Sequence, residues 1–179
     1  MRPTLQDGPM SPPTSSGTVV EIDPAHFRSV LGHYPTGVCV VTGKTEGQTA
    51  AGLVIGTFSS VSLKPPLVGF YPALASGSWS KIRADGRFCV NVLGADQLDL
   101  CRKFAARGAN KFHGVSHRTS EHGLAILDDV VAAIECDVVD EREAGDHTMV
   151  LGQVIALQIL RSASPLLFFR GQYGTFSPL

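Results

Sequence analysis

The sequence predicts a mainly β fold of the α+β class, an antiparallel barrel with flanking helices. About seven apolar segments of strand length recur, mostly at hairpin spacing, whereas only two or three segments have helical periodicity. The helical segments do not alternate regularly with the strands, as a parallel sheet of βαβ units would require. With 179 residues, 44% of them hydrophobic, the chain has the size and composition of one domain with a substantial core.

The beginning of the chain divides into a tail and a first helix. Residues 1–19 are rich in Pro, Ser, Thr and Gly, which predicts a flexible N-terminal tail before a single domain over residues 20–179. Asp23 is a good N-cap, and Pro24 suits the first position of a helix. The helix is expected to end near residue 32. Its apolar face consists of Phe27, Val30 and Leu31.

The remaining chain reads as strands with two further helices. Strands are expected at residues 37–42, 49–55, 67–71, 87–93, 131–139, 150–160 and 166–169, and helices at residues 76–84 and 95–106. Between the second and third of these strands the chain reads GTFSSVSLKPPLVG, with four hydroxyl residues in a stretch that otherwise resembles a strand. Alternation lets one face of this stretch pack while the other borders a polar ligand, and the two prolines end its pairing.

Composition excludes several classes of function. The 15 basic and 16 acidic side chains give a formal charge of -1, without the basic surface that a nucleic-acid partner requires. No apolar run approaches the roughly 20 residues that span a bilayer, and the N-terminus lacks the apolar centre of a secretory signal. We therefore expect a cytoplasmic protein without a membrane partner. Its cysteines, expected as buried hydrophobes, are Cys39, Cys89, Cys101 and Cys136.

Motifs for common catalytic machinery are missing from the sequence. There is no GxGxxG after the first strand, no P-loop and no GxSxG elbow. The histidines of the loop at residues 108–123 do not have the spacing of zinc ligands, so no metal site is expected. What remains is the hydroxyl-rich stretch, the Ser-Gly-Ser-Trp segment from Ser76 to Trp79, and a Gly-Asp-His turn ending at His147. Ser76 and Ser78 stand at the start of a helix, where they suit a phosphate or simple N-capping.

Five segments, taken together and in order, resemble the flavin reductase family of split-barrel flavin-binding proteins. They are FRSVLGHYPTGVCVVT, GLVIGTFSSVSLKPPLV, SGSW with GRFCVNVL, AGDHTMVLGQV, and PLLFFRGQYG. The resemblance implies an antiparallel split β-barrel of the FMN-binding type, a homodimer, and a flavin near the dimer interface. It also implies hydride transfer from NADH or NADPH to FMN or FAD, and delivery of the reduced flavin to a partner monooxygenase.

The resemblance also implies roles for particular residues. Those expected along the flavin ring and ribityl chain are Thr57, Ser59 and Ser60, with Gly56 contributing through its backbone alone. Those expected at the phosphate end are Ser76, Ser78, Trp79, Lys111 and Phe112. His147 is the expected catalytic residue on the nicotinamide side, with Tyr173 near the same pocket and with Thr36 and Gly37 in a turn close to the cofactors.

Two departures from the family pattern leave an alternative function open. Family members often carry Asn or another polar residue where this chain has Gly56, and a small polar one where it has Val54. A non-catalytic flavin-binding protein, acting as a carrier or a sensor, is therefore the second hypothesis. Flavin binding without steady-state oxidation of NAD(P)H would distinguish it from a reductase.

Overall fold

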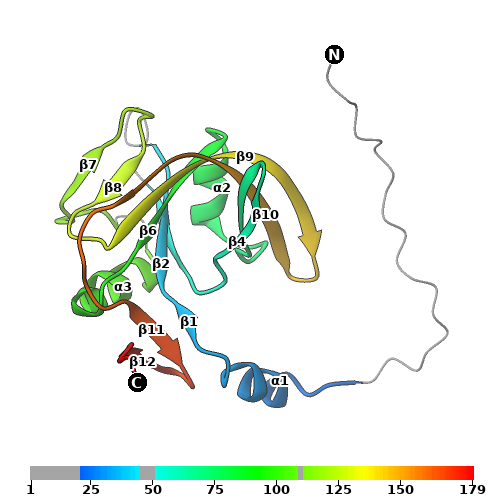
Figure 1. Cartoon of the computed structure of the whole chain (residues 1–179). Coiled ribbons are helices and arrows are strands. Elements are labelled where there is room, and N and C mark those ends of the chain that lie inside the picture. Colours follow the sequence, from blue (N-terminus) through cyan, green and yellow to red (C-terminus); the bar gives the residue numbers. More distant parts are fainter. Residues whose placement is uncertain (1–20, 45–50, 109–110) are drawn as a thin grey trace.

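The computed structural model describes residues 21–44, 51–108 and 111–179 (Figure 1). The predicted tail at residues 1–19 and the first residue of the predicted domain lie outside the described residues. The helical segments are α1 (Pro24–Leu31), α2 (Gly77–Arg83), the short 3-10 helix η1 (Ala95–Gln97) and α3 (Leu98–Ala105). The first six strands are β1 (Thr36–Gly37), β2 (Cys39–Thr42), β3 (Gly52–Ile55), β4 (Ser59–Leu63), β5 (Pro66–Phe70) and β6 (Arg87–Val92). The later ones are β7 (His117–Thr119), β8 (Ala125–Leu127), β9 (Ala132–Ala144), β10 (His147–Ile159), β11 (Leu166–Phe169) and β12 (Gln172–Thr175).

The fold is mostly β with few helices, and every strand pairing in the described chain is antiparallel. One seven-stranded sheet has the order β3-β2-β6-β9-β10-β5-β4. A three-stranded sheet joins β1 to β11 and β12, and β7 pairs with β8. Helix α2 packs against β3 and β6, whereas α3 packs against β3 and β2. The predicted mainly β, antiparallel class is confirmed.

The seven-stranded sheet is strongly curled. Its edges are β3 and β4, which are not paired with each other, yet only residues 56–58 separate them along the chain. In a flat sheet of seven strands the edges would stand about 29 Å apart, at about 4.8 Å between neighbours. The chain from Ile55 to Ser59 can span at most about 14 Å. The two edges must therefore approach each other at this end, where Gly56 and Thr57 lie.

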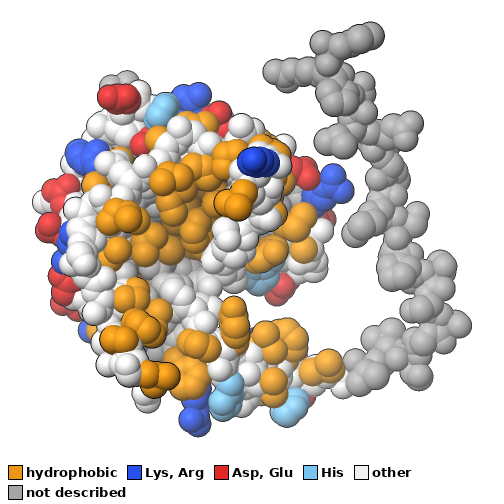
Figure 2. Space-filling view, in the orientation of Figure 1, with side chains coloured by type: hydrophobic (Ala, Val, Ile, Leu, Met, Phe, Trp, Pro, Cys, Tyr) orange, Lys and Arg blue, Asp and Glu red, His pale blue; other side chains and the backbone are white. Residues whose placement is uncertain are grey.

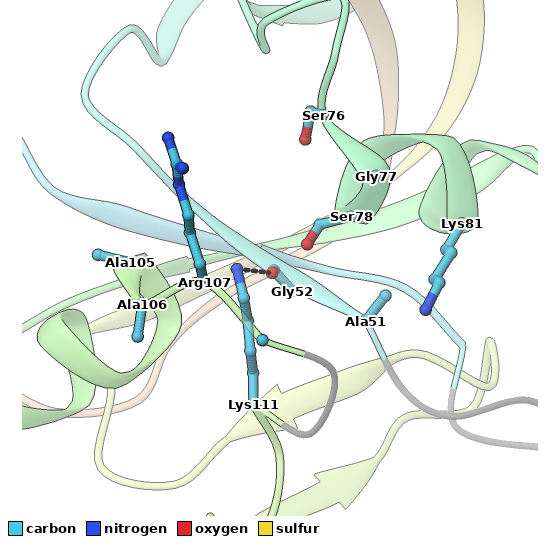
Figure 3. Close-up of a pocket in the computed structure, with 11 residues that line it drawn as sticks. Ala51, Gly52, Ser76, Gly77, Ser78, Lys81, Ala105, Ala106, Arg107 and Lys111 are labelled. Atoms are coloured by element: carbon cyan, nitrogen blue, oxygen red, sulfur yellow. Dashed lines mark hydrogen bonds between the residues drawn. The ribbon is translucent and has the colours of Figure 1, made fainter.

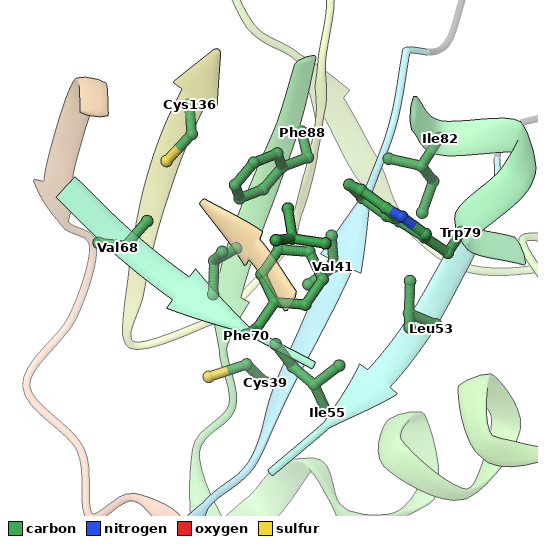
Figure 4. Close-up of a cluster of buried hydrophobic side chains, with 12 residues drawn as sticks. Cys39, Val41, Leu53, Ile55, Val68, Phe70, Trp79, Ile82, Phe88 and Cys136 are labelled. Atoms are coloured by element: carbon green, nitrogen blue, oxygen red, sulfur yellow. The ribbon is translucent and has the colours of Figure 1, made fainter. Parts of the chain in front are cut away.

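A core of apolar side chains fills the inside of the curled sheet (Figure 4). Its centre is a set of edge-to-face aromatic contacts, in which the ring of Phe70 lies 5.1 Å from that of Trp79 and 5.2 Å from that of Phe88. All four cysteines are free and buried, as expected. Burial raises the pKa of the Cys39 and Cys136 thiols to about 12, since the thiolate would lose its hydration.

Helix α1 forms as predicted but packs on little of the body. The carboxylate of Asp23 accepts a hydrogen bond from the backbone N–H of His26 at 2.9 Å, and Pro24 occupies the first turn. The apolar residues of the helix are not buried: Phe27, Val30 and Leu31 are each 53% exposed. Helix α1 lies at the foot of the molecule in Figure 1, where the space-filling view of Figure 2 shows hydrophobic side chains at the surface. This face lacks a partner among the described residues.

The structure differs from the expected elements in three places. The strands expected at residues 131–139 and 150–160 extend toward each other, so that only a two-residue turn at Gly145–Asp146 remains between them, because β9 and β10 pair up to Ala144 and His147. The two prolines were expected to end pairing, but β4 pairs with β5 up to Pro66. Pro66 is the first residue of β5, a position at which a strand tolerates a residue without a backbone N–H. Strands β7, β8 and β12 were not expected, because they are only three or four residues long. No helix in the described ranges is long and apolar enough to cross a membrane.

Candidate active site

Three adjoining hollows line one side of the curled sheet. The inner hollow, of about 450 Å³, lies against β3 and the loop after it. Its lining includes Ile55, Gly56, Thr57, Tyr71, Pro72, Ser76, Ser78, Phe104, Lys111 and His147. The cationic hollow, of about 370 Å³, continues from it and is lined by Ala51, Gly52, Ser76, Gly77, Ser78, Lys81, Ala105, Ala106, Arg107, Gly108 and Lys111. Because they share Ser76, Ser78, Ala105 and Lys111, the two hollows form one groove.

The third, outer hollow opens at the other end of this groove and has a volume of about 680 Å³. It lies between α1 and the β9–β10 turn, and its lining includes Ile22, Pro24, Phe27, Arg28, Ala144 and Asp146. It shares three residues, Thr57, Tyr71 and His147, with the inner hollow. A ligand in the outer hollow would therefore meet a ligand in the inner hollow at these three side chains.

The loop between β3 and β4 forms the wall of the inner hollow. The hydroxyl of Thr57 accepts a hydrogen bond from the backbone N–H of Tyr71 at 3.0 Å, which ties the loop to the end of β5. Gly56 faces β1, since a Cβ atom there would lie 2.8 Å from the Thr36 hydroxyl oxygen. The Thr36 side chain therefore occupies the space that a side chain at Gly56 would fill. The hydroxyl group of Thr36, on β1, therefore lies beside Gly56, the position where the sequence departs from the family pattern.

Ser76, Ser78 and Lys111 meet where the inner and cationic hollows join (Figure 3). Ser76 caps α2 by accepting a hydrogen bond from the backbone N–H of Trp79 at 3.2 Å. The ammonium group of Lys111 donates to the Phe104 carbonyl oxygen at 2.7 Å and to the Gly52 carbonyl oxygen at 3.4 Å. Partial burial lowers its pKa, because the charged ammonium loses hydration. The ammonium is thus held between α3 and β3 at the junction.

The charges of the groove have one sign. Lys81, Arg107 and Lys111 line it, and no Asp or Glu is among the residues that line the inner and cationic hollows. This contrasts with the nearly neutral chain as a whole. Hydroxyls and cations converging without a carboxylate suit an anionic ligand such as a phosphate.

His147 lies where the inner and outer hollows meet. Its backbone is fixed because Thr148 donates to the Pro72 carbonyl oxygen at 2.9 Å and Leu74 donates to that of Asp146 at 3.0 Å. Its Nδ1 atom lies 2.7 Å from a carboxylate oxygen of Asp146. This hydrogen bond to the imidazole, with the accompanying charge attraction, lowers the pKa of the Asp146 carboxyl. With Nδ1 engaged, Nε2 is the ring atom left for a ligand.

The structure brings together part of the predicted site. Lining residues of the groove include Gly56, Thr57, Ser76, Ser78, Lys111 and His147. Thr36 adjoins Gly56, and Gly37 follows it as an exposed residue of β1. Ser59 and Ser60 are exposed on the edge strand β4 and line none of the three hollows.

Three predicted aromatic residues lie outside the lining of the groove. Trp79 is 3% exposed in the core, and its indole N–H donates to a carboxylate oxygen of Glu141 at 2.7 Å. The ring of Phe112 packs edge-to-face on Phe104, 5.1 Å away, behind the groove wall. Tyr173 packs on β11, and its hydroxyl accepts a hydrogen bond from the Cys101 thiol at 3.5 Å. None of these three rings lines a hollow, so a ligand bound within the three hollows would not touch them.

Sequence reasoning missed several residues of the groove. Tyr71 and Pro72 follow an apolar strand without any local sign of a site. Arg107 lies just after the end of α3 and Lys81 lies within α2, where isolated cations usually mark solvated faces. Arg28 lies on α1, far from His147 in the sequence. For Lys81 and Arg107, the only available signal was the positive charge in the last turn of α2 and just after α3, two helices that pack against β3.

Fold and groove together define a class of protein: a curled antiparallel β domain with a groove lined by cations and hydroxyl groups, which suits an anionic ligand. The chain belongs to the flavin reductase family, since the model of the flavin reductase like domain matches residues 31–177. It is 49% identical to a flavin reductase of Pseudomonas putida over 158 residues, which cover 88% of this chain and 93% of that one. It is 41% identical over 160 residues to HsaB of Mycobacterium tuberculosis, the reductase subunit of a flavin-dependent monooxygenase, covering 88% and 85%.

Solved structures agree with this assignment. A homolog of nitrilotriacetate monooxygenase component B from Mycobacterium thermoresistibile superposes with a TM-score of 0.82 at 42% identity, covering 86% of this chain and 87% of that one. The NADH:FAD oxidoreductase SgcE6 of Streptomyces globisporus, in complex with NAD and FAD fragments, gives a TM-score of 0.81 at 34% identity, with coverages of 87% and 94%. The family recognised from the five sequence segments is therefore confirmed.

Proposed function

We propose that this protein is an NAD(P)H-dependent flavin reductase that transfers hydride from a nicotinamide to FMN or FAD and supplies the reduced flavin to a partner monooxygenase. One observation supports this above all: the anion-binding groove and the outer hollow meet at Thr57, Tyr71 and His147. Two ligands can thus lie against each other there. The names of relatives point the same way, among them monooxygenase reductase subunits and components.

The residues of the inner hollow suit a flavin. Its walls combine apolar side chains, such as Leu53 and Ile55, with hydroxyl groups and backbone, which matches a flat heterocycle with a polar edge. The absence of a Cβ at Gly56 lets the chain pass close to Thr36, so that a backbone edge is available beside the ring. Ser76, Ser78 and Lys111 at the junction suit the phosphate. The missing side chain at Gly56 is therefore compatible with binding.

The protein's contribution to the reaction is positioning. Bound flavin supplies the electron-accepting chemistry, so the chain needs neither a nucleophile nor an acid–base pair. Thr57 and Tyr71 hold the shared wall in place through their hydrogen bond, which keeps the meeting point of the two ligands in a fixed geometry. His147 presents Nε2 to the outer hollow, where it would orient the carboxamide of the nicotinamide ring. Arg28 and Phe27 form the opposite wall.

We also propose that the curled sheet is a split barrel and that the protein works as a homodimer. The approach of the β3 and β4 edges without pairing supports a split barrel. The half-exposed apolar face of α1 supports a dimer, because a patch of this kind usually marks an interface. Sedimentation of a dimeric mass would agree with this proposal, and a monomer at micromolar concentration would contradict it. Four free, buried cysteines agree with a cytoplasmic location.

The experiment for the function measures oxidation of NADH and NADPH, with FMN or FAD as acceptor, from the absorbance of the reduced nicotinamide. Steady turnover is expected with at least one pair of substrates. No turnover at saturating flavin, together with measurable flavin binding, would favour the carrier or sensor hypothesis instead.

His147→Ala tests the assignment of the nicotinamide side. Because its imidazole lines the outer hollow, the variant should raise the KM for NAD(P)H about tenfold, the loss expected for one hydrogen bond of about 1.4 kcal/mol. The Kd for flavin should stay within about twofold of the wild-type value. His113→Ala is the control, since that exposed histidine lies outside the three hollows. An unchanged KM would remove His147 from this role.

A further inference from the structure

The cationic hollow extends the groove beyond the point where a single phosphate is satisfied. Ser76, Ser78 and Lys111 line both hollows and stand at the junction. Lys81 and Arg107 line only the cationic hollow. Figure 3 shows these two side chains on opposite sides of the space, with the Ser78 hydroxyl and the Lys111 ammonium between them. A ligand that ended at the junction would leave both outer cations unused.

FMN and FAD share the riboflavin unit and the first phosphate. FMN ends at this phosphate, whereas FAD continues into a second phosphate and an adenosine. The relatives do not decide between them: SmoA of Agrobacterium fabrum is an FMN reductase, whereas SgcE6 is an NADH:FAD oxidoreductase. The choice therefore depends on this chain's own residues beyond the junction.

We propose that the cationic hollow is a subsite for the second phosphate and the adenosine of FAD, in which Arg107 and Lys81 select FAD over FMN. This inference rests on the proposed function, since it assumes that the inner hollow holds the flavin ring. Lys111 and the two serines then contact the first phosphate, and the guanidinium of Arg107 or the ammonium of Lys81 contacts the second.

The space in the cationic hollow fits this assignment. Its volume of about 370 Å³ is within the range of small-molecule pockets, about 300–1,000 Å³, and is comparable to the 450 Å³ of the inner hollow. Much of its lining consists of the small residues Ala51, Gly52, Ala105, Ala106 and Gly108, which leave a broad floor for a flat base. A phosphate monoester alone would not need a chamber of this size.

The charges fit the same assignment. Lys111 is already held by the Phe104 and Gly52 carbonyl oxygens, so it is a cation fixed at the junction of the two hollows. Arg107 and Lys81 are exposed at the rim, and no carboxylate lies among the lining residues to neutralise them. Two successive phosphates, one beside Lys111 and one beside Lys81 and Arg107, neutralise these positive charges better than a single phosphate at the junction.

The experiment measures equilibrium Kd values for FAD, FMN and riboflavin by titration calorimetry, beside KM values for the same three flavins. The wild-type protein should bind FAD about tenfold more tightly than FMN, since one added charge-assisted contact contributes about 1.5 kcal/mol. The Lys81→Ala/Arg107→Ala double variant should raise the Kd for FAD about tenfold and bring it close to that for FMN. Both side chains are exposed, so the variant is expected to fold.

Arg102→Ala is the matched control, because Arg102 is an exposed arginine of α3 shortly before Arg107 in the chain and pairs with Asp99 outside the groove. It should leave the ratio of the two Kd values unchanged. Equal affinities of the wild-type protein for FAD and FMN would overturn the proposal, as would an equal loss for both flavins in the double variant. In either case turnover with NAD(P)H would still support the reductase. A lack of turnover with every flavin would instead overturn the proposed function.

Discussion

Replacing Gly56 with alanine tests directly how the wall of the inner hollow is built. The new Cβ would lie 2.8 Å from the Thr36 hydroxyl oxygen, well inside van der Waals contact. The backbone of Gly56 is not in the left-handed region, so alanine can adopt it and the contact is the main obstacle. Thr36 must then turn away from its present position, and its hydroxyl leaves its place beside Gly56.

The size of the effect follows from this contact. Forcing a side chain off its rotamer costs about 0.5–1.5 kcal/mol, and overpacking costs about 1–3 kcal/mol. Alanine also lowers the conformational entropy of the unfolded chain, which stabilises the folded state by about 0.4–1 kcal/mol. Gly56→Ala should therefore lower the free energy of unfolding by about 1 kcal/mol. If the Thr36 hydroxyl contributes to binding, the Kd for flavin should rise about fivefold.

A double-mutant cycle isolates the contact. In Gly56→Ala/Thr36→Ala the new methyl group meets the Cβ of residue 36 at 3.7 Å and the Gly37 carbonyl oxygen at 3.8 Å, which are ordinary contacts. The second substitution should therefore remove the strain, with a coupling energy of about 1–2 kcal/mol in urea denaturation. Gly174→Ala is the control, because a Cβ there meets nothing within 4 Å. Additive effects within about 0.5 kcal/mol would refute the reasoning, as would a Gly56→Ala variant as stable as this control.

Three further predictions concern other parts of the molecule. Gly152→Ala should lower the free energy of unfolding by about 3 kcal/mol, since its Cβ would meet the buried ring of Phe88; a loss below about 1 kcal/mol in urea denaturation would contradict this packing. The Asp146 carboxyl should titrate below the ordinary pKa of about 3.9 in an NMR experiment, so its contribution to stability is present above that pH and is lost as the pH falls through the lowered pKa. A midpoint at or above the ordinary value would count against its hydrogen bond. The native protein should react with iodoacetamide at neutral pH far more slowly than the unfolded chain, because the pKa values of the Cys39 and Cys136 thiols are about 12; fast labelling of either, read by mass spectrometry, would show that it is not buried.

Local elements were predictable because their signals are local. Asp23 and Pro24 define the start of α1, and Ser76 caps α2, since each capping contact lies within one helical turn. The apolar runs of β2 and β6 are fully or largely buried central strands, which read as strands without any partner being known. Short strands such as β12 were missed because four residues carry too little pattern, and pairing with β11 is what orders them.

The candidate site was predictable only in part. Thr57, Ser76, Ser78 and His147 stood out through hydroxyl clustering and a recognisable turn, and the structure brings them to one groove. The direction of a side chain was not predictable. Trp79 follows Ser78 directly, yet the helical turn points its ring into the core beside Phe70.

The sequence by itself determined the family, the antiparallel β class and the kinds of chemistry available, because these follow from strand patterns, turn residues and five ordered motifs. Only the tertiary structure decided which side chains meet. Curling of the sheet brings the β3 and β4 edges together at Gly56 and Thr57 and carries the β9–β10 turn to the same place. Lys81 of α2 and Arg107, just after α3, are far apart along the chain and become two sides of one hollow. Such contacts depend on packing between distant segments, and a pattern of neighbouring residues does not contain that information.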